Sequence, residues 1–226
     1  MDIPLDNENA PSNTRLPTTS ELGTLLALPL LDENGRKVAF GDVLNTSEEH
    51  SGKTVIVLFI RHFWCPLDQD YVQEVGDILR RLSEEKGGWQ LATKVVIISN
   101  GSPALIAKYK EIFDLEGKKG SNLKIKMYTD PTCQTYSLLG MENVGEASTH
   151  GSVSRSYVKH TSAIGGMAAV VLRAIKVGMP VWERGGAIKQ LGGELVDSEM
   201  HVACMFAHRM RDTQDHTPFG DVLKIA

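Results

Sequence analysis

A single cysteine stands where an apolar segment gives way to a helix start, in the run RHFWCPLD at residues 61–68. Residues 54–62, TVIVLFIRH, are mostly apolar and β-branched, which is typical of a central buried strand. Pro66 suits the first position of a helix. We therefore expect Cys65 at a helix N-terminus, where free amide groups and the helix dipole favour a thiolate and lower the pKa of the thiol.

Asp68 follows Cys65 by three residues, and its carboxylate has more than one use. It can cap the helix by accepting a backbone amide, and its charge would then raise the pKa of the nearby thiol. As a base it would take a proton from Cys65 or from a substrate, with Arg61 or His62 adding positive charge. His62, Cys65 and Asp68 also suit zinc, but one ends a strand and two begin a helix, so we expect no metal.

Composition excludes several classes of function. The chain has 226 residues, of which 42% are hydrophobic and 23% charged, as is usual for one globular domain. A net charge of -4 offers no basic face for nucleic acid. Neither a signal peptide nor a bilayer-spanning segment is predicted, so we expect a cytoplasmic protein with no membrane partner. Three scattered cysteines favour reduced thiols over a disulfide scaffold.

The remaining segments predict strands and helices that would hold this helix start in place. We expect a flexible arm at residues 1–20, either docked on the domain or not, and a hairpin around the Asn-Gly turn in 28–40. Further strands are expected at 93–99, 123–130, 192–196 and 201–209, helices at 66–87, 102–115, 130–140, 161–178 and 217–226, and an insertion at 141–157. This order predicts an α/β fold with a mixed central sheet flanked by helices. Ligands of such sheets bind beyond the carboxyl ends of the strands, where Cys65 is expected.

Three motifs in this order resemble a known family. They are FIRHFWCPLDQDYVQEV, YTDPTCQTYSLLGM and QLGGELV followed by CMFAHRMRDTQDHTPFGDVL. Together they resemble the peroxiredoxin-like branch of the alkyl hydroperoxide reductase/thiol-specific antioxidant family, in the thioredoxin superfamily. The resemblance implies a thioredoxin-like domain over residues 21–226 with an N-terminal hairpin, and it makes Cys65 the nucleophilic cysteine. Asp68 replaces the second cysteine of the family's Cys-x-x-Cys motif, and His62 stands where standard peroxiredoxins have a threonine.

Several other residues are candidates for the site. Cys204, in a late strand, is the candidate for a distant resolving thiol, although a buried core cysteine is the alternative. Cys133 is more strongly expected in the core. Phe63, Trp64 and Pro66 flank Cys65 and are expected to line a substrate pocket.

A polar cluster also follows the last predicted strand. His208, Arg209, Asp215 and His216 either bind an anionic substrate or cap and solvate the turn, and we favour the turn. Arg184, just before a Gly-Gly pair, is a further candidate to reach the site, although its spacing does not require this.

These observations leave three functions open. The leading one is a thiol-dependent oxidoreductase of antioxidant type, in which Cys65 attacks a peroxide, a disulfide or a small organic substrate without a cofactor. Cys204, glutathione or thioredoxin would restore the thiol. The alternative is a non-redox isomerase, cyclase or lyase of secondary metabolism that uses Cys65 and Asp68. The third is a silent binding protein. A homodimer would use a sheet edge or residues 141–157.

Overall fold

In the part of the chain that the structure describes, a seven-stranded sheet forms the centre, in the order β2-β1-β5-β4-β3-β6-β7. The structure is a computed structural model that describes residues 12–45, 54–84, 93–115, 125–145, 156–159, 163–197 and 204–226. The strands are β1 (Pro29–Leu31), β2 (Lys37–Ala39), β3 (Thr54–Phe59), β4 (Thr93–Ser99), β5 (Lys126–Thr129), β6 (Gly193–Asp197) and β7 (Cys204–Arg209). Because β3, β4 and β5 are parallel and the other neighbours are antiparallel, the sheet is mixed, as predicted.

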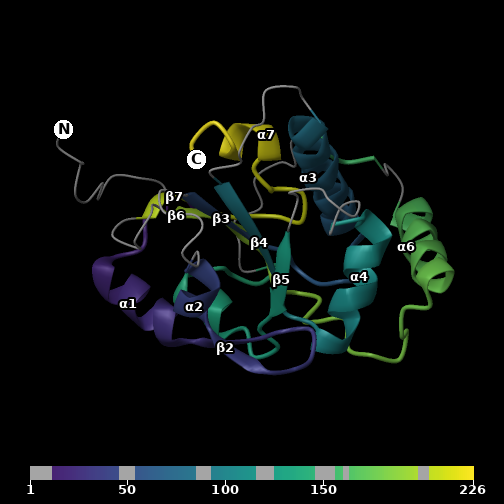
Figure 1. Cartoon of the computed structure of the whole chain (residues 1–226), viewed down its shortest axis with the longest axis horizontal. Helices are drawn as coiled ribbons and strands as arrows, with labels where there is room; N and C mark the ends of the chain where they lie inside the picture. Colours follow the sequence, from purple (N-terminus) through teal and green to yellow (C-terminus); the bar gives the residue numbers. More distant parts are fainter. Residues whose placement is uncertain are drawn as a thin grey trace.

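Helices cover both faces of this sheet (Figure 1). One face carries α3 (Pro66–Glu84), α4 (Ile106–Phe113) after the 3-10 turn η2 (Pro103–Leu105), α6 (Ala163–Val177) and α7 (Phe219–Val222). The other face carries α1 (Thr19–Ala27), α2 (Phe40–Leu44) and α5 (Gln134–Leu138). Alternate residues of β3 enter the two cores, with Ile56 and Leu58 on the α3 face and Val57 on the other. Five of the six β3 side chains are therefore buried.

The segment that carries Cys65 leaves the sheet at the carboxyl edge of the parallel strands. The last paired residues of β3 and β4 are Phe59 and Ile98, and those of β4 and β5 are Ser99 and Thr129, so the three strands end at the same edge. The predicted strand at 54–62 is too long by three residues, because the amide groups of Arg61 and His62 bond to a side chain instead of a neighbouring strand. Strand 93–99 has its predicted bounds.

Helix α3 also begins where it was predicted, at Pro66. Its buried stripe includes Val72, Val75 and Leu79, as the sequence pattern indicates. The predicted stop at Gly87-Gly88 lies outside the described residues. Among the helices that the structure describes, none is both long and apolar enough to cross a bilayer.

The second half of the predicted N-terminal arm is docked on the domain. Helix α1 begins inside it, and Thr18 and Glu21 form a reciprocal capping box. The backbone amide of Arg209 donates to the carbonyl of Asn13 at 2.8 Å, and its Nη1 donates to that of Arg15 at 2.7 Å. Asn13 and Arg15 therefore lie against the end of β7, so this part of the predicted arm docks on the domain. Residues 1–11 lie outside the described part of the chain.

Candidate active site

Cys65 occupies the helix N-terminus that the sequence predicts. Its carbonyl accepts the amide of Gln69 at 3.0 Å, which is the first bond of α3, and its own amide donates to the carbonyl of His62 at 3.1 Å. The side chain is only 2% exposed. The strand-to-helix connection thus holds the sulfur at the carboxyl edge of the sheet but shields it from solvent.

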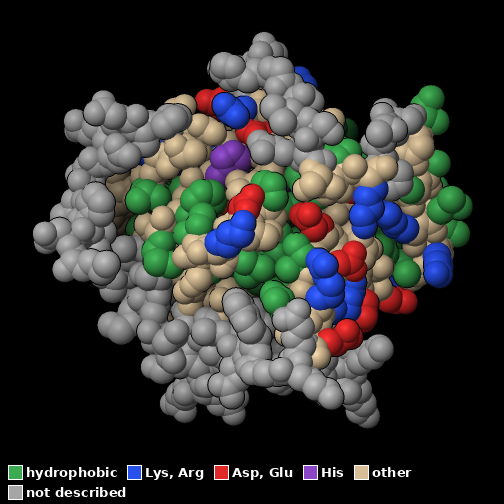
Figure 2. All heavy atoms as spheres, turned by 90° about the horizontal axis from the view of Figure 1, so that it is seen from above, with side chains coloured by type: hydrophobic (Ala, Val, Ile, Leu, Met, Phe, Trp, Pro, Cys, Tyr) green, Lys and Arg blue, Asp and Glu red, His purple; other side chains and the backbone are tan. Residues whose placement is uncertain are grey.

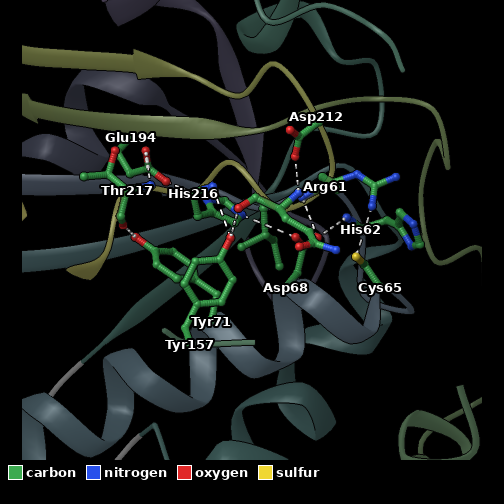
Figure 3. Close-up of polar contacts among 12 residues, drawn as sticks. Arg61, His62, Cys65, Asp68, Tyr71, Tyr157, Glu194, Asp212, His216 and Thr217 are labelled. Carbon is green, nitrogen blue, oxygen red and sulfur yellow. Dashed lines mark hydrogen bonds and ion pairs between the residues drawn. The ribbon is translucent and has the colours of Figure 1, made fainter. Parts of the chain in front are cut away.

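Arg61 lies against the sulfur (Figure 3). Its Nη1 donates to Cys65 Sγ at 3.2 Å, and its Nη2 donates to the carbonyl of Ile188 at 2.8 Å. Its Nε is buried and has no hydrogen-bond partner among the described residues. The backbone therefore fixes Nη2 of the guanidinium, Nη1 faces the thiol, and Nε is a buried donor without a hydrogen bond to the described residues.

The pKa of Cys65 is shifted in the opposite direction from that expected. Burial and the negative charge of Asp68 raise the pKa of the thiol to about 12, against the lowering effects of Arg61 and of the amide groups of Leu67 and Asp68. The helix N-terminus acts as predicted, but desolvation exceeds it. His62 adds no positive charge at neutral pH, because burial holds its pKa below the usual value. In this state Cys65 is a thiol.

Asp68 joins the segment between β3 and α3 to the C-terminal part of the chain. Its Oδ2 accepts the amides of Arg61 at 2.8 Å and His62 at 3.1 Å, and its Oδ1 contacts Nε2 of His216 at 3.3 Å. The side chain is fully buried. Burial would raise the pKa of this carboxyl, but the hydrogen bond and charge of His216 hold it below the ordinary value. Asp68 is therefore ionised and has a structural role: one oxygen accepts the two backbone amides and the other contacts His216.

A chain of buried charges continues from Asp68 into the domain (Figure 3). His216 Nδ1 contacts Glu194 Oε1 at 2.5 Å, the other oxygen of Glu194 meets His208 Nδ1 at 2.8 Å, and His208 Nε2 lies 3.5 Å from Asp215. These carboxylates outweigh burial and raise the pKa of each imidazole to about 9. The two imidazoles in turn hold the pKa of Glu194 at about 2 despite its burial. Carboxylates and imidazolium ions thus alternate from Asp68 to Asp215.

The sequence interpretation of this region is wrong in part. His208, Asp215 and His216 do not form a solvated turn, since each is buried in the network. Arg209 points elsewhere and bonds to the carbonyl of Leu139. Glu194 was missed, although a lone carboxylate in the apolar run GGELV is a signal that a buried partner is needed.

Two tyrosines that were also missed enclose His216. The ring of Tyr71 stacks on the imidazole with centroids 4.2 Å apart, and the hydroxyl of Tyr157 accepts the amide of His216 at 3.2 Å. Nothing in the local sequence of either tyrosine indicates this contact. The rings exclude water from the imidazolium, which strengthens its attraction to the carboxylates.

The loop of residues 184–188 closes over the cysteine segment. The carbonyl of Gly185 accepts the amide of Phe63 at 3.1 Å. A Cβ on Gly185 would lie 1.7 Å from Cδ1 of Trp64, so only glycine allows this approach. Trp64 is partly buried and contacts this loop. Phe63 is fully buried against Tyr109 and belongs to the core. Pro66 is half-buried in the first turn of α3.

Comparisons with known proteins agree with this architecture. The family model described as AhpC/TSA antioxidant enzyme matches residues 79–212, which is more than half of the chain. The chain belongs to the AhpC/TSA family. The match begins after Cys65 and Asp68, so the assignment does not depend on the thiol motif. Membership in this family supports thiol-dependent redox function in general.

Relatives and solved structures give the same fold. Peroxiredoxin-like 2C from Mus musculus is 26% identical over 201 residues, covering 88% of this chain and 76% of that protein, and the Homo sapiens protein is 25% identical with the same coverage. Peroxiredoxin 6 of Arenicola marina has a TM-score of 0.53 at 12% identity, covering 88% of this chain and 68% of that one. Peroxidoxin BcpB from Mycobacterium tuberculosis has a TM-score of 0.50 at 12% identity, covering 88% and 90%. These structures show a thioredoxin-like fold.

Within this AhpC/TSA domain, Cys204 is remote from Cys65. Cys204 pairs with Asp197, which pairs with Val55 at the start of β3, whereas Cys65 follows the end of that strand. Val55 and Phe59 are four residues apart, which is about 13 Å along a strand, and this distance alone is too long for a disulfide. Cys204 also belongs to the core on the opposite face of the sheet, and burial raises its pKa to about 12. The structure does not bring Cys204 to Cys65 as a resolving thiol.

Cys133 lies at the same edge of the sheet as Cys65, just after β5. It is partly buried at the start of α5, where burial and Asp130 raise the pKa of its thiol and Arg184 opposes them. Arg184 therefore acts near Cys133, while its own backbone carbonyl accepts the amide of Ser102 at 2.8 Å.

Among the described residues, no group of three His, Cys, Asp or Glu side chains could hold a metal ion.

Proposed function

We propose that this protein is a one-cysteine thiol oxidoreductase that reduces a hydroperoxide at Cys65. The observation that supports it most directly is the 3.2 Å contact between Arg61 Nη1 and Cys65 Sγ. A fixed guanidinium stabilises a thiolate as it forms, and it also stabilises negative charge on the oxygen that leaves. The unpartnered Nε of Arg61 offers a second donor for that oxygen.

The chemistry needs one cysteine and an external thiol. The sulfur of Cys65 attacks the nearer peroxide oxygen, the O–O bond breaks, and the alcohol leaves with the thiol proton, giving a sulfenic acid. A first reductant thiol displaces water to form a mixed disulfide, and a second releases Cys65 as a thiol. Glutathione or a thioredoxin-type dithiol supplies both electrons, since Cys204 lies too far along the sheet.

The rival acid–base reaction has less support. A general base must have a free oxygen within reach of the proton that it accepts. Both oxygens of Asp68 are occupied, one by the amides of Arg61 and His62 and the other by His216. Proton transfer to Asp68 would break the contacts that hold Cys65 and Arg61 in place.

Trapping of the sulfenic acid tests the proposal. The full chain is treated with hydrogen peroxide or an alkyl hydroperoxide, labelled with dimedone, and analysed by mass spectrometry of the Cys65 peptide. We expect labelling of Cys65 and consumption of glutathione, both lost in Cys65→Ser. Arg61→Met is expected to slow labelling by about 10- to 100-fold, because it removes one charge-assisted hydrogen bond.

Matched controls use the other two thiols. Cys133→Ser and Cys204→Ser are expected to leave labelling of Cys65 unchanged. An unlabelled Cys65 after exposure to both peroxides would reject the proposal. Turnover of an organic substrate that needs Asp68 but consumes no reductant would replace it with the acid–base function.

A further inference from the structure

Helix α6 presents an apolar face to solvent. Ile164, Met167, Val171, Leu172 and Ile175 form this outer face, and their exposed fractions run from 45% for Val171 to 84% for Ile164. Hydrophobic side chains gather along the edge of the molecule where α6 lies (Figure 2). Isolated exposed apolar residues are common on monomers, but a contiguous face on one helix marks an interaction surface.

The inner side of α6 already attaches the helix to the domain. Val170 and Ala174 are fully buried. Arg173 donates to Oε1 of Gln69 at 3.0 Å, and Gln69 donates to the carbonyl of Phe63 at 3.1 Å. The outer face therefore contributes nothing to the fold of the described chain and is available to a partner.

The spacing on the outer face suits another helix. Ile164, Ala168, Val171 and Ile175 follow one another at intervals of four, three and four, which is the pattern of the a and d positions of a helix–helix seam. Ala168, an exposed small residue between bulkier ones, allows the two backbones to approach closely. The stripe follows one side of the helix for about 16 Å at 1.5 Å per residue.

Charge distinguishes among possible occupants. Residues 163–177 contain no acidic residue, and Lys176 is the exposed basic one because Arg173 points inward. A single lysine on a chain of net charge -4 gives little attraction to an anionic membrane. Two copies of α6 in antiparallel order place the two lysines at opposite ends, whereas a parallel pair brings them together.

We infer that the outer face of α6 packs antiparallel against α6 of a second copy of this chain, forming a two-fold symmetric dimer. Each large side chain buries roughly 60–120 Å² when fully covered, so the partly exposed face contributes on the order of 300 Å² of apolar area per copy. Exposed Val181 and Trp182 follow the helix and extend the apolar segment. The helix face alone is smaller than a standard specific interface, so we expect a weak dimer whose population depends on protein concentration.

Sedimentation of the full chain at several concentrations tests the inference. We expect the mass to rise from 24.8 kDa toward twice that value between low and high micromolar concentrations. Leu172→Glu and Ile175→Glu should each weaken the dimer at least about 100-fold, because symmetry places every substitution in the interface twice. Glutamate favours helices and both sites are exposed, so the far-ultraviolet circular dichroism should be unchanged.

Met205→Glu is the matched control. Met205 is 42% exposed on β7, the edge strand that a sheet-edge dimer would use. Loss of the dimer in Met205→Glu with retention in Leu172→Glu would overturn the α6 pairing in favour of the edge. A wild-type chain that stays monomeric, or that instead binds vesicles of phosphatidylcholine and phosphatidylserine through Leu172, would also overturn it.

Cysteine cross-linking tests the orientation. In an antiparallel pair residue 164 faces residue 175 of the other copy, so a mixture of Ile164→Cys and Ile175→Cys chains should form a disulfide between unlike copies. Either chain alone should form no more cross-linked product than the wild type, whose three native thiols provide the background. Self-linked Ile164→Cys would show a parallel pair and reject the stated arrangement.

Discussion

Removal of the Asp68 carboxylate should reveal whether this residue has a structural role or acts as a general base. In Asp68→Ala two buried amides, those of Arg61 and His62, lose their acceptor, at about 1–3 kcal/mol each. The imidazolium of His216 loses one of its two carboxylates, and breaking a buried pair costs about 3–5 kcal/mol. These effects overlap, so we expect the free energy of unfolding to fall by at least about 4 kcal/mol.

Asp68→Asn separates the hydrogen bonds from the charge. The amide oxygen still accepts both backbone amides, and the amide nitrogen can donate to Nε2 of a neutral His216. With the pKa of His216 at about 9, loss of its proton at pH 7 costs about 3 kcal/mol. The penalty should be largest below pH 6.5, where the wild-type imidazolium contributes fully, and should shrink as the pH approaches 9.

Urea unfolding at pH 6 and pH 9, followed by circular dichroism, measures both variants. Asp221→Ala is the control, since Asp221 forms an exposed pair with Lys224 and should cost well under 1 kcal/mol. An Asp68→Ala variant that loses no more stability than this control would refute the structural role of Asp68.

The same Asp68→Asn variant also reports on Cys65. Across the roughly 5–6 Å between residues three apart on a helix, a unit charge is worth about 3 kcal/mol at an effective dielectric constant of 20. Removal of that charge lowers the pKa of the thiol, and the loss of the His216 proton in the same variant offsets part of this effect. Alkylation of Cys65 at pH 7 should therefore accelerate about 10- to 100-fold. A base role for Asp68 predicts slower alkylation instead.

Three further outcomes are expected. Because the pKa of His216 is raised to about 9, its stabilisation is complete below about pH 6.5 and should fall by about 3 kcal/mol by pH 9. His208 titrates in the same window, so the contribution of His216 is measured as the difference between the pH profiles of the wild type and His216→Gln. With the pKa of Cys65 at about 12, its alkylation rate in the native chain should rise about tenfold per pH unit from 7 to 10, and a plateau below pH 9 would contradict this value. Gly185→Ala should lose about 1–3 kcal/mol in thermal unfolding because it displaces Trp64, whereas Gly23→Ala, with open space around it, should be slightly stabilising; equal effects would contradict the close approach.

Strands and helices with long apolar patterns could be predicted from the sequence. Strand β4 and the start of α3 match their predictions because continuous burial and a proline at the first helical position are local signals. Helices α1 and α2 were not predicted. With nine and five residues they bury few side chains, and their position depends on packing against each other and against the sheet.

The electrostatics of the site could not be predicted in the same way. The placement of Cys65 at a helix start was correct, but the direction of its pKa shift was wrong because local sequence carries no measure of desolvation. The charged partner of Asp68 is similarly hidden, because His216 lies more than 120 residues away and reaches Asp68 only through tertiary packing. Glu194, which contacts the other side of the His216 imidazole, is also far from Asp68 in the sequence. Tertiary structure, not motif spacing, assigns the role of Asp68.

The role of Asp68 depends on the residues that surround it. An ionised side chain can be buried here because His216 supplies a positive charge and because Glu194 holds that charge in turn. A cysteine at position 68 would leave the imidazolium with one carboxylate and the amides of Arg61 and His62 with a weak acceptor. The charge network therefore depends on a carboxylate at position 68, and Asp68→Cys alone should lose stability for the same reasons as Asp68→Ala.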